Sequence, residues 1–561
     1  MSVPGEPGTG AGVSRDGRYG HDPRSSERAT LEQLAAEPAD LLVIGGGITG
    51  AGVARDAAMR GLRTVLVEQG DFGSGSSSLS SRLIHGGLRY LETGDLRLVL
   101  EANRERRVLL RIAPHLVWPL PFIFPLHQGD RLSRWRLAAG MWVYDGLALF
   151  RNVQVHRILG KRRLLEAEPM LRERGLLGGA RFYDAQCDDA RLVLATLRSA
   201  LRHGALAANY VMVGALERTA GRVVGAQVED RLTGQRAVIR AHVVVNATGP
   251  WSDRVRTLED PEAPRLLTPT KGIHVVVDRE RLGHREAIIF LSPIDGRVLF
   301  ILPWRRLSYI GTTDTDTDEP PDRLTVSAED IVYLLRSANA RFPNARLRLE
   351  DVRASWAGLR PLLAKNADRS ASARSREHLI VRGSGGMLTV VGGKLTTYRV
   401  MAREVVNRAV RDLRMRAYRS RPDEARTDEE ALPGGEAADL TPFRDRGLDL
   451  GLTAECVEHL LRQYGTEAAG IFNLGAGDRR LLRPLSPTHP AIEAEVVHAA
   501  RREMAQTLPD VLIRRLHLYY EEADHGARAV RRVAELMGAE RGWSSDRIEA
   551  EIAGYLRLAQ A

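Results

Sequence analysis

The patterned part of the chain begins with a short run of uninterrupted apolar residues. Residues 41–44 (LLVI) lead into a cluster of three glycines, a helical pattern follows up to Gly61, and a second apolar run, TVLV, occupies 64–67. Short and fully apolar runs are typical of buried parallel strands. The pattern therefore predicts a compact β-α-β unit at the start of the folded chain.

Strand-like runs recur further along the chain. Those at 243–245 and 388–391 each enter a turn of small residues, as the first run does. Between them lie short runs separated by polar or glycine-containing turns, at 273–277, 287–291, 298–303 and 308–312. Such runs predict antiparallel sheet, whereas residues 440–561 have helical periodicity. We therefore predict an α/β fold, with a Rossmann-type domain, an inserted antiparallel-sheet domain and a C-terminal helical domain.

Composition distinguishes two segments from these units. Residues 1–39 are rich in glycine, proline, serine and charge, and we expect a disordered N-terminal extension there. Residues 411–437 carry charges, prolines and glycines, which is typical of a linker. The predicted helical domain then spans 438–561.

Composition also narrows the classes of function. The 561 residues include only two cysteines, which argues against a disulfide framework, and we expect no metal site. The net charge is +10, but acidic residues are interspersed with the arginines and aromatic residues make up only 5%. We therefore expect no nucleic-acid partner, and the positive charge favours attraction to phosphate or anionic lipid.

The first glycine turn carries a cofactor fingerprint. Gly45-x-Gly47-x-x-Gly50 follows a predicted strand and opens a predicted helix. In such turns the glycines make the bend, admit a pyrophosphate and let the helix pack closely. Glu68 ends the next strand, where a carboxylate accepts a hydrogen bond from a ribose hydroxyl and disfavours a ribose 2′-phosphate. The motif predicts FAD or NAD.

Two later turns favour FAD, because a cofactor of its length can touch widely spaced segments. They contain Thr248-Gly249 and Gly392-Gly393, and Lys394 follows the second turn. A cation at a helix start can stabilise the negative charge of a reduced isoalloxazine. Lys394 is one of only four lysines among 81 basic residues, which favours a specific role over a solvated surface position.

A segment rich in serine and glycine, residues 73–91, contains His85, Arg89 and Tyr90 near its end. One interpretation is a flexible loop followed by a helix. The other is a loop that contacts the cofactor, with these three side chains converging on a substrate. The residues alone leave both interpretations open.

Several motifs resemble those of FAD-dependent glycerol-3-phosphate dehydrogenases. IGGGITGAGVARDAAMRG at 44–61 and GGKLTTYRVMA at 392–402 are similar to the two signatures of that family, and five shorter motifs follow in the same order: SSRLIHGGLRYLE (80–92), DDARLVLA (188–195), VNATGPW (245–251), IGTTDTD (310–316) and GLRPL (358–362). The resemblance spans residues 40 to 540 and implies an FAD-dependent oxidoreductase region at 40–430. Within it we expect FAD-binding segments near 40–90, 180–265 and 350–425 and substrate segments near 91–180 and 266–349.

The resemblance implies an activity. Members of the family oxidise sn-glycerol 3-phosphate to dihydroxyacetone phosphate, passing a hydride from C2 to flavin N5 and electrons usually to a membrane quinone. An oxidase that uses O₂ on the same substrate is a close alternative. A flavoprotein that modifies tRNA is a remote alternative, because the arginines are scattered along the chain. A scaffold without catalysis is another, which the intact set of candidate site residues disfavours.

The resemblance also implies roles for individual residues. The residues expected to hold FAD are Gly45, Gly47, Gly50, Glu68, Ser80, Ser81, Thr248, Gly249, Gly393, Lys394, Leu395 and Thr396. Those expected to bind the substrate are Arg89, Tyr90, Arg360 and Arg376, since guanidinium forks match a phosphate dianion. Those expected to act in catalysis are His85, Arg360 and Lys394. Histidine is a suitable base for the C2 hydroxyl, although His85 could equally position the flavin.

A quinone-linked enzyme without a spanning helix must bind the membrane surface. Residues 395–414 form a basic amphipathic pattern that could lie in the interface or pack into a core. Residues 131–150, which contain Trp135, Trp142, Tyr144 and Phe150, are a weaker second candidate, because such aromatic residues are more often core. We expect a cytoplasmic enzyme bound peripherally to anionic lipid at the inner face of the cell membrane, and a homodimer is left open.

Overall fold

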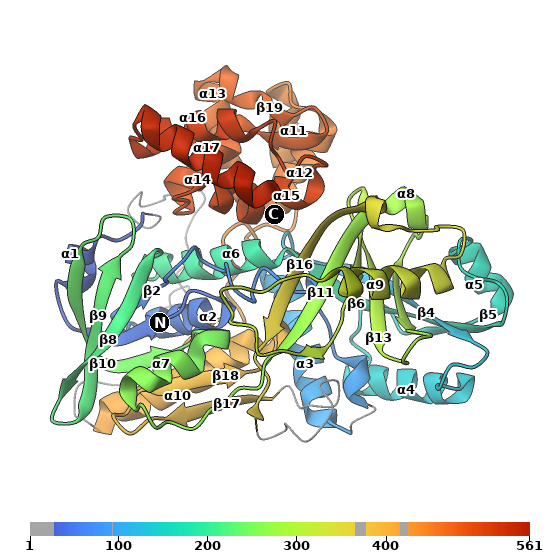
Figure 1. Ribbon diagram of the computed structural model, residues 1–561, viewed down its shortest axis with the longest axis horizontal. Coiled ribbons are helices and arrows are strands. Elements are labelled where there is room, and N and C mark those ends of the chain that lie inside the picture. Colours follow the sequence, from blue (N-terminus) through green and yellow to red (C-terminus); the bar gives the residue numbers. More distant parts are fainter. Residues whose placement is uncertain (1–26, 92–93, 365–376, 416–423, 561) are drawn as a thin grey trace, which may run out of the picture.

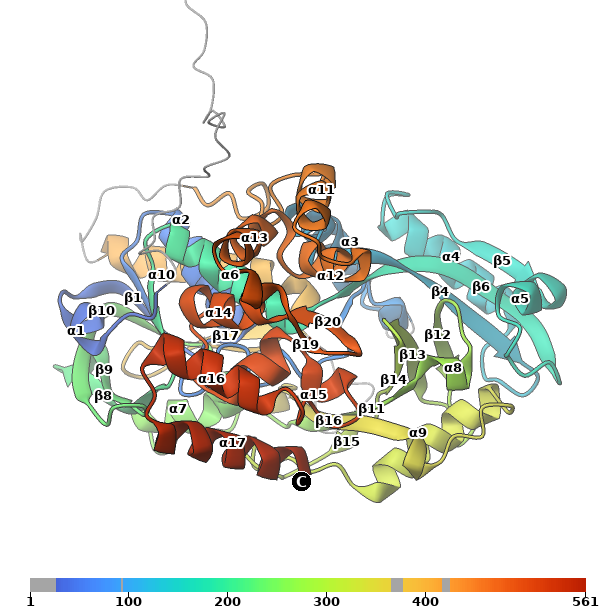
Figure 2. The same cartoon turned by 90° about the horizontal axis from the view of Figure 1, so that it is seen from above.

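The computed structural model describes residues 27–91, 94–364, 377–415 and 424–560. These residues form a domain around an eight-stranded sheet, a second around a ten-stranded sheet, and a helical C-terminal domain that contacts both (Figure 1). The predicted fold class is confirmed. Figure 2 shows the C-terminal helices lying over the middle of the molecule, with α4 and α5 at the end away from the first sheet.

The first sheet contains the predicted β-α-β unit. β1 (Ala39–Ile44) pairs in parallel with β2 (Thr64–Val67) and with β10 (Arg236–Asn246), and α2 (Ile48–Met59) connects β1 to β2. Every residue of β1 and β2 is buried, as expected of parallel strands covered on both faces. The remaining strands are β7 (Leu206–Ala208), β8 (Val211–Thr219), β9 (Arg222–Asp230), β17 (His378–Arg382) and β18 (Leu388–Gly392).

Three helices cover one face of this sheet. α2 packs against α6 (Asp189–Arg202) and α10 (Tyr398–Met415). A Cβ atom at Gly52 would lie 2.9 Å from Cδ2 of Tyr398, so a glycine is needed where α2 and α10 approach. The shorter α7 (Ser252–Glu259) follows β10.

Of the two interpretations of residues 395–414, the structure supports packing into a core and not a membrane interface. The apolar face of α10 is part of the core, with Val405 and Val406 fully buried. Arg399 on the same helix is also buried, and its guanidinium donates to both carboxylate oxygens of Glu105 at 2.7 and 2.9 Å. The amphipathic pattern therefore reflects packing within the protein.

The second sheet includes the four short strands that the pattern predicts. They are β11 (Thr270–Asp278), β12 (Ala287–Leu291), β13 (Val298–Trp304) and β14 (Leu307–Gly311). Among the described strands of this sheet, every pairing is antiparallel except that of β4 with β12. The other strands are β3 (Leu83–Ile84), β4 (Val117–His127), β5 (Arg157–Gly160), β6 (Leu176–Cys187), β15 (Thr315–Asp316) and β16 (Val352–Arg360). The helices of this region are α3 (Leu96–Ile112), α4 (Arg134–Leu147), α5 (Lys161–Ala167), α8 (Arg279–Leu282) and α9 (Ala328–Arg341).

The C-terminal domain is helical, as predicted, with one short hairpin formed by β19 (Pro484–Ser486) and β20 (His489–Ile492). Its own apolar core includes Val511 and Leu512, both fully buried. The helices are α11 (Thr441–Asp449), α12 (Ala454–Tyr464), α13 (Ala468–Gly477), α14 (Glu493–Arg502), α15 (Leu518–Glu521), α16 (Val530–Arg541) and α17 (Ser545–Gln560), with a π-type turn, η10 (Asp510–Arg515), before α15.

Two segments differ from their compositional interpretation. Residues 27–39 are ordered: α1 (Leu31–Ala35) has a capping box between Thr30 and Gln33, and Leu34 is fully buried. The expected disorder of the N-terminal extension is wrong for these residues, and residues 1–26 lie outside the described part. In the predicted linker, residues 424–437 pack onto the first domain, where Arg55 of α2 donates to the backbone oxygens of Thr427 and Glu430.

Candidate functional site

The glycine turn between β1 and α2 is tightly closed. Gly45 has a φ of +107°, and a Cβ atom at Gly50 would lie 1.8 Å from the Gly45 carbonyl oxygen. Gly47 differs, because its Cβ atom would meet only Ser77 Oγ, at 3.1 Å. Gly45 and Gly50 are therefore required by the turn itself, whereas the space beside Gly47 is left open for a ligand.

Glu68 stands at the end of β2 and faces this turn. Its carboxylate accepts hydrogen bonds from the amides of Gly46 and Gly70, at 2.6 and 2.8 Å. Burial raises the pKa of Glu68 above its usual value, and these two bonds act in the opposite direction. The two hydrogen bonds from the backbone amides fix the orientation of the Glu68 carboxylate.

A cavity of about 900 Å³ extends from the glycine turn along the carboxyl ends of the parallel strands. Such crevices are the usual ligand sites of open α/β sheets. The predicted cofactor residues that line it are Gly45, Gly47, Glu68, Ser80, Thr248, Gly249, Gly393, Lys394 and Leu395. Gly50 lies outside the lining because it closes the turn.

A second cavity, of about 660 Å³, adjoins the first. The two share six lining residues: Ser76, Ser80, Pro361, Gly393, Lys394 and Leu395. The second cavity also brings together the predicted residues Ser81, His85, Tyr90, Arg360, Lys394 and Thr396. A long ligand in the first cavity would therefore present one end to a small ligand in the second.

Arg360, at the end of β16, is fixed by three acceptors in the second cavity. Its guanidinium donates to Thr312 Oγ1 at 2.8 Å, to the Thr313 carbonyl at 3.0 Å and to Asp314 at 3.1 Å. A Cβ atom at Gly272 would lie 2.6 Å from an Arg360 nitrogen, so a larger residue there would displace the guanidinium. The result is a permanent cation in a fixed plane.

Lys394 also lines this cavity. Its ammonium nitrogen is 3.5 Å from the centre of the Tyr90 ring, which is a close cation–π contact. Nearby, the His85 amide donates to Thr396 Oγ1 at 3.2 Å. The motif around His85 and the motif around Lys394 therefore meet directly, although they are far apart in the sequence.

Two predicted substrate residues are only partly placed. Arg89 belongs to the short turn η2 (Leu88–Leu91), next to Tyr90. Arg376 lies outside the described residues. Their suggested contacts with a phosphate stay predictions.

Sequence reasoning missed His274, which lines the second cavity from β11. Its Nε2 atom is 2.9 Å from Ser81 Oγ, and its ring stacks on Trp356 with centroids 4.9 Å apart. Burial, with added repulsion from Arg360 and Arg82, lowers the pKa of His274 to about 3. The available signal was an imidazole within the otherwise apolar run IHVVV. Arg131 and Arg297 also line this cavity and were missed.

Comparison with known proteins agrees with this geometry. Residues 40–399 match the family model of FAD-dependent oxidoreductases, and 425–548 match that of the C-terminal domain of alpha-glycerophosphate oxidase. Glycerol-3-phosphate dehydrogenase 2 of Mycobacterium tuberculosis is 38% identical over 537 residues, which cover 94% of this chain and 89% of that protein. The chain belongs to the FAD-dependent glycerol-3-phosphate dehydrogenase family.

Members of this family from distant organisms are similarly close. The mitochondrial glycerol-3-phosphate dehydrogenase of Homo sapiens is 38% identical over 540 residues, covering 93% of this chain and 73% of that protein. The crystal structure of the glycerol-3-phosphate dehydrogenase from Bacillus halodurans complexed with FAD superposes with a TM-score of 0.79 at 31% identity, covering 94% of this chain and 96% of that one. FAD is thus the cofactor, and the open space at Gly47 and the carboxylate of Glu68 fit its pyrophosphate and ribose.

The glycine turn yields a test of the FAD cavity. We expect Gly47→Val to give folded protein without flavin, because the backbone φ of −76° suits any residue and the new side chain enters the cavity. Absorbance of the purified protein in the flavin region measures the loading. Gly50→Ala is the contrasting variant: its Cβ atom would overlap the Gly45 carbonyl, so we expect a loss of about 1–3 kcal/mol in unfolding free energy. Full flavin loading of Gly47→Val would contradict this assignment.

Proposed function

We propose that this protein oxidises sn-glycerol 3-phosphate to dihydroxyacetone phosphate. The observation that carries the proposal is the junction of the two cavities, where the flavin end of one meets a smaller space lined by Arg360, His85 and Lys394. When bound, FAD supplies the hydride acceptor, its N5 atom. The names of the relatives support the choice of substrate.

In this proposal Arg360 binds the phosphate group. Its bonds to Thr312, Thr313 and Asp314 hold the guanidinium in place before the substrate arrives. A preorganised fork matches a phosphate oxyanion in charge and geometry. Arg89, Tyr90 and Arg376 are proposed as further contacts to the phosphate. Lys394 is proposed to stabilise negative charge on the reduced flavin.

Oxidation at C2 requires a base for the hydroxyl proton, and two imidazoles line the cavity. A pKa of about 3 makes His274 a poor proton acceptor near neutral pH. His85 is half-buried, whereas His274 is only 3% exposed and its ring stacks on Trp356. We therefore assign His85 as the base and His274 as the residue that holds Ser81.

The physiological acceptor is proposed to be a membrane quinone. Anaerobic stopped-flow mixing of the yellow protein with sn-glycerol 3-phosphate tests substrate and acceptor together. We expect the substrate to bleach the flavin band, and a quinone analogue to restore it faster than O₂ does. Faster recovery with O₂ would make the protein an oxidase, and no bleaching of bound flavin would overturn the substrate.

Three variants test the assigned residues. We expect His85→Asn to lower kcat by about 100-fold to 10,000-fold with little change in KM, because only the proton acceptor is lost. Arg360→Lys should raise the KM for sn-glycerol 3-phosphate by about tenfold or more, because a single ammonium cannot replace the fork. His274→Asn is the matched control for the base. The variants are compared by steady-state kinetics at equal flavin content. A larger loss of kcat in His274→Asn than in His85→Asn would contradict the assignment of the base.

Membrane binding is proposed to use α4 and the segment that follows it. No helix in the described ranges is long and apolar enough to cross a bilayer. Trp135 and Trp142 on α4 are 69% and 58% exposed, and Leu149 and Phe150 beyond it are 59% and 58% exposed. Exposed arginines stand near them in the sequence: Arg134, Arg136, Arg151 and Arg157. Tryptophan beside basic side chains suits the headgroup region of an anionic membrane.

Flotation with anionic phospholipid vesicles tests this face. We expect Trp135→Ser with Phe150→Ser to weaken vesicle binding by about tenfold or more, because two buried aromatic rings would be lost from the interface. Leu349→Ser, at a residue 51% exposed on another part of the surface, should leave it unchanged. Binding of the unaltered protein should weaken with salt. If the variant with Trp135→Ser and Phe150→Ser bound vesicles as before but changed its oligomeric state, this face would be a subunit contact instead.

A further inference from the structure

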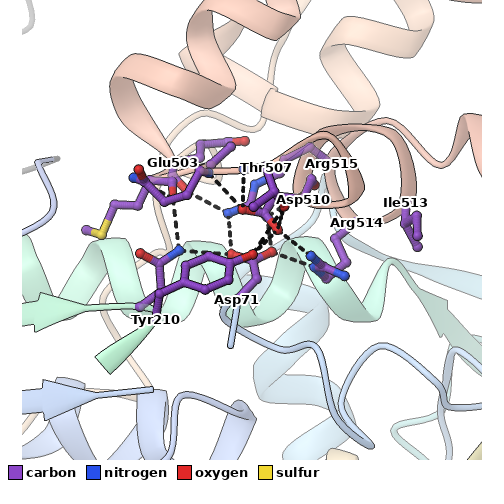
Figure 3. A network of polar contacts seen from close by, with 12 residues as sticks. Asp71, Tyr210, Glu503, Thr507, Asp510, Ile513, Arg514 and Arg515 are labelled. Carbon is purple, nitrogen blue, oxygen red and sulfur yellow. Dashed lines mark hydrogen bonds and ion pairs between the residues drawn. The ribbon is translucent and has the colours of Figure 1, made fainter. Parts of the chain in front are cut away.

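A network of buried charges joins the C-terminal domain to the loop that follows Glu68 (Figure 3). Its centre is the carboxylate of Asp71, which is 2% exposed. Arg514 Nε donates to it at 2.5 Å, and Arg515 donates to both of its oxygens, one of them at 3.0 Å. Both arginines end the turn η10 of the C-terminal domain.

The turn η10 and the segment before it also form hydrogen bonds with the connection between β7 and β8. The Tyr210 hydroxyl donates to Asp510 at 2.6 Å, and the Asn209 side chain donates to the Met504 carbonyl at 2.9 Å and to Asp71 at 3.2 Å. Asp510 in turn accepts from Arg514 at 2.5 Å. Two carboxylates and two guanidinium groups therefore balance each other in a largely buried site, in which the Arg514 side chain alone of the four is partly exposed, at 12%.

Both segments held in this way form a wall of the FAD cavity. Glu68 and Gly70 line it from the first segment, and residues 211–214 line it from the second. The two segments are joined by backbone bonds, from the Val211 amide to the Glu68 carbonyl at 2.7 Å and from the Tyr210 amide to the Gly70 carbonyl at 2.9 Å. Asp71, Arg514 and Arg515 themselves do not line the cavity, so any effect on FAD passes through this wall.

We propose that Arg514 and Arg515 of the C-terminal domain position the Glu68 end of the FAD site through Asp71, so that FAD affinity depends on this contact. Displacement of Asp71 would release the bend between Gly70 and Gly73 that keeps Glu68 beside the glycine turn. The contact acts on cofactor binding and is independent of which substrate the enzyme oxidises. By reciprocity, FAD must tighten the contact as much as the contact tightens FAD.

Asp71→Asn tests the proposal, because it keeps the shape of the side chain and removes its charge. We expect the FAD dissociation constant of the refilled apoprotein, measured by flavin fluorescence, to rise about tenfold or more. At saturating FAD, kcat should stay within about twofold of the unaltered enzyme.

Glu467→Gln is the matched control. Glu467 of the C-terminal domain accepts from Arg198 and Arg202 of α6, at 2.7 and 2.8 Å, and is also buried. This variant breaks an ion pair between the same two domains without touching the FAD wall, so its FAD dissociation constant should change by less than about twofold. Equal FAD loss in both variants, or none in Asp71→Asn, would overturn the proposal.

A measurement on the unaltered chain covers the case in which Asp71→Asn fails to fold. Hydrogen exchange of apoprotein and FAD-loaded protein should differ at the amides of 503–516, none of which lines the FAD cavity. We expect slower exchange there in the FAD-loaded protein and no comparable change in α17. Identical exchange at 503–516 would overturn the proposal, whether or not sn-glycerol 3-phosphate is the substrate.

Discussion

The buried guanidinium of Arg82 is the interaction on which the arrangement of the three domains depends. Only 1% of Arg82 is exposed, and it lies 4.3 Å from the ring centre of Trp304 and 5.7 Å from that of Tyr520 in the C-terminal domain. It donates to the Tyr309 hydroxyl at 2.8 Å and lies 3.7 Å from Asp189 of α6. Burial disfavours its charge, but Tyr309 and Asp189 outweigh that effect and keep the pKa of Arg82 above its usual value. Cation–π contacts and one ion pair thus join residues from every domain around one charge.

The segment around Arg82 then places the groups that face the junction of the cavities. Ser80 donates to Asp189 at 2.7 Å, Ser81 contacts His274 at 2.9 Å, and the His85 amide donates to Thr396. Neighbouring positions of this short stretch are therefore bound to different domains. A shift of any one domain would be transmitted to the cavity, because the intervening residues are packed and hydrogen-bonded.

Hydrophobic patterns predicted the helices and strands in which the local sequence alone shows which residues are buried. The unit β1–α2–β2 and the four strands from β11 to β14 are of this kind. β4 was not predicted, because its sequence VWPLPFIFPLH contains Pro119, Pro121 and Pro125. The three prolines are two and four residues apart, so all three missing N–H donors fall on the same edge of the strand. The strand forms in spite of them because it pairs with β6 along its whole length. His274 was missed for a similar reason, since its partner Ser81 is supplied by tertiary structure.

Sequence patterns also could not decide which of two segments, residues 395–414 or residues 131–150, contacts a membrane. An amphipathic pattern states that one face of a helix is apolar, but it does not state what covers that face. In α10 the cover is the first sheet and α2, and arginines such as Arg399 find carboxylate partners inside the protein. In α4 the apolar residues divide: Met141 and Tyr144 are buried against the second sheet, whereas Trp135 and Trp142 point outward. Trp142 packs edge-to-face against His156 and the Arg136 guanidinium lies over the Trp135 ring, yet both tryptophans stay more than half exposed. Of the two candidates, α4 therefore fits the membrane contact proposed above better than α10 does.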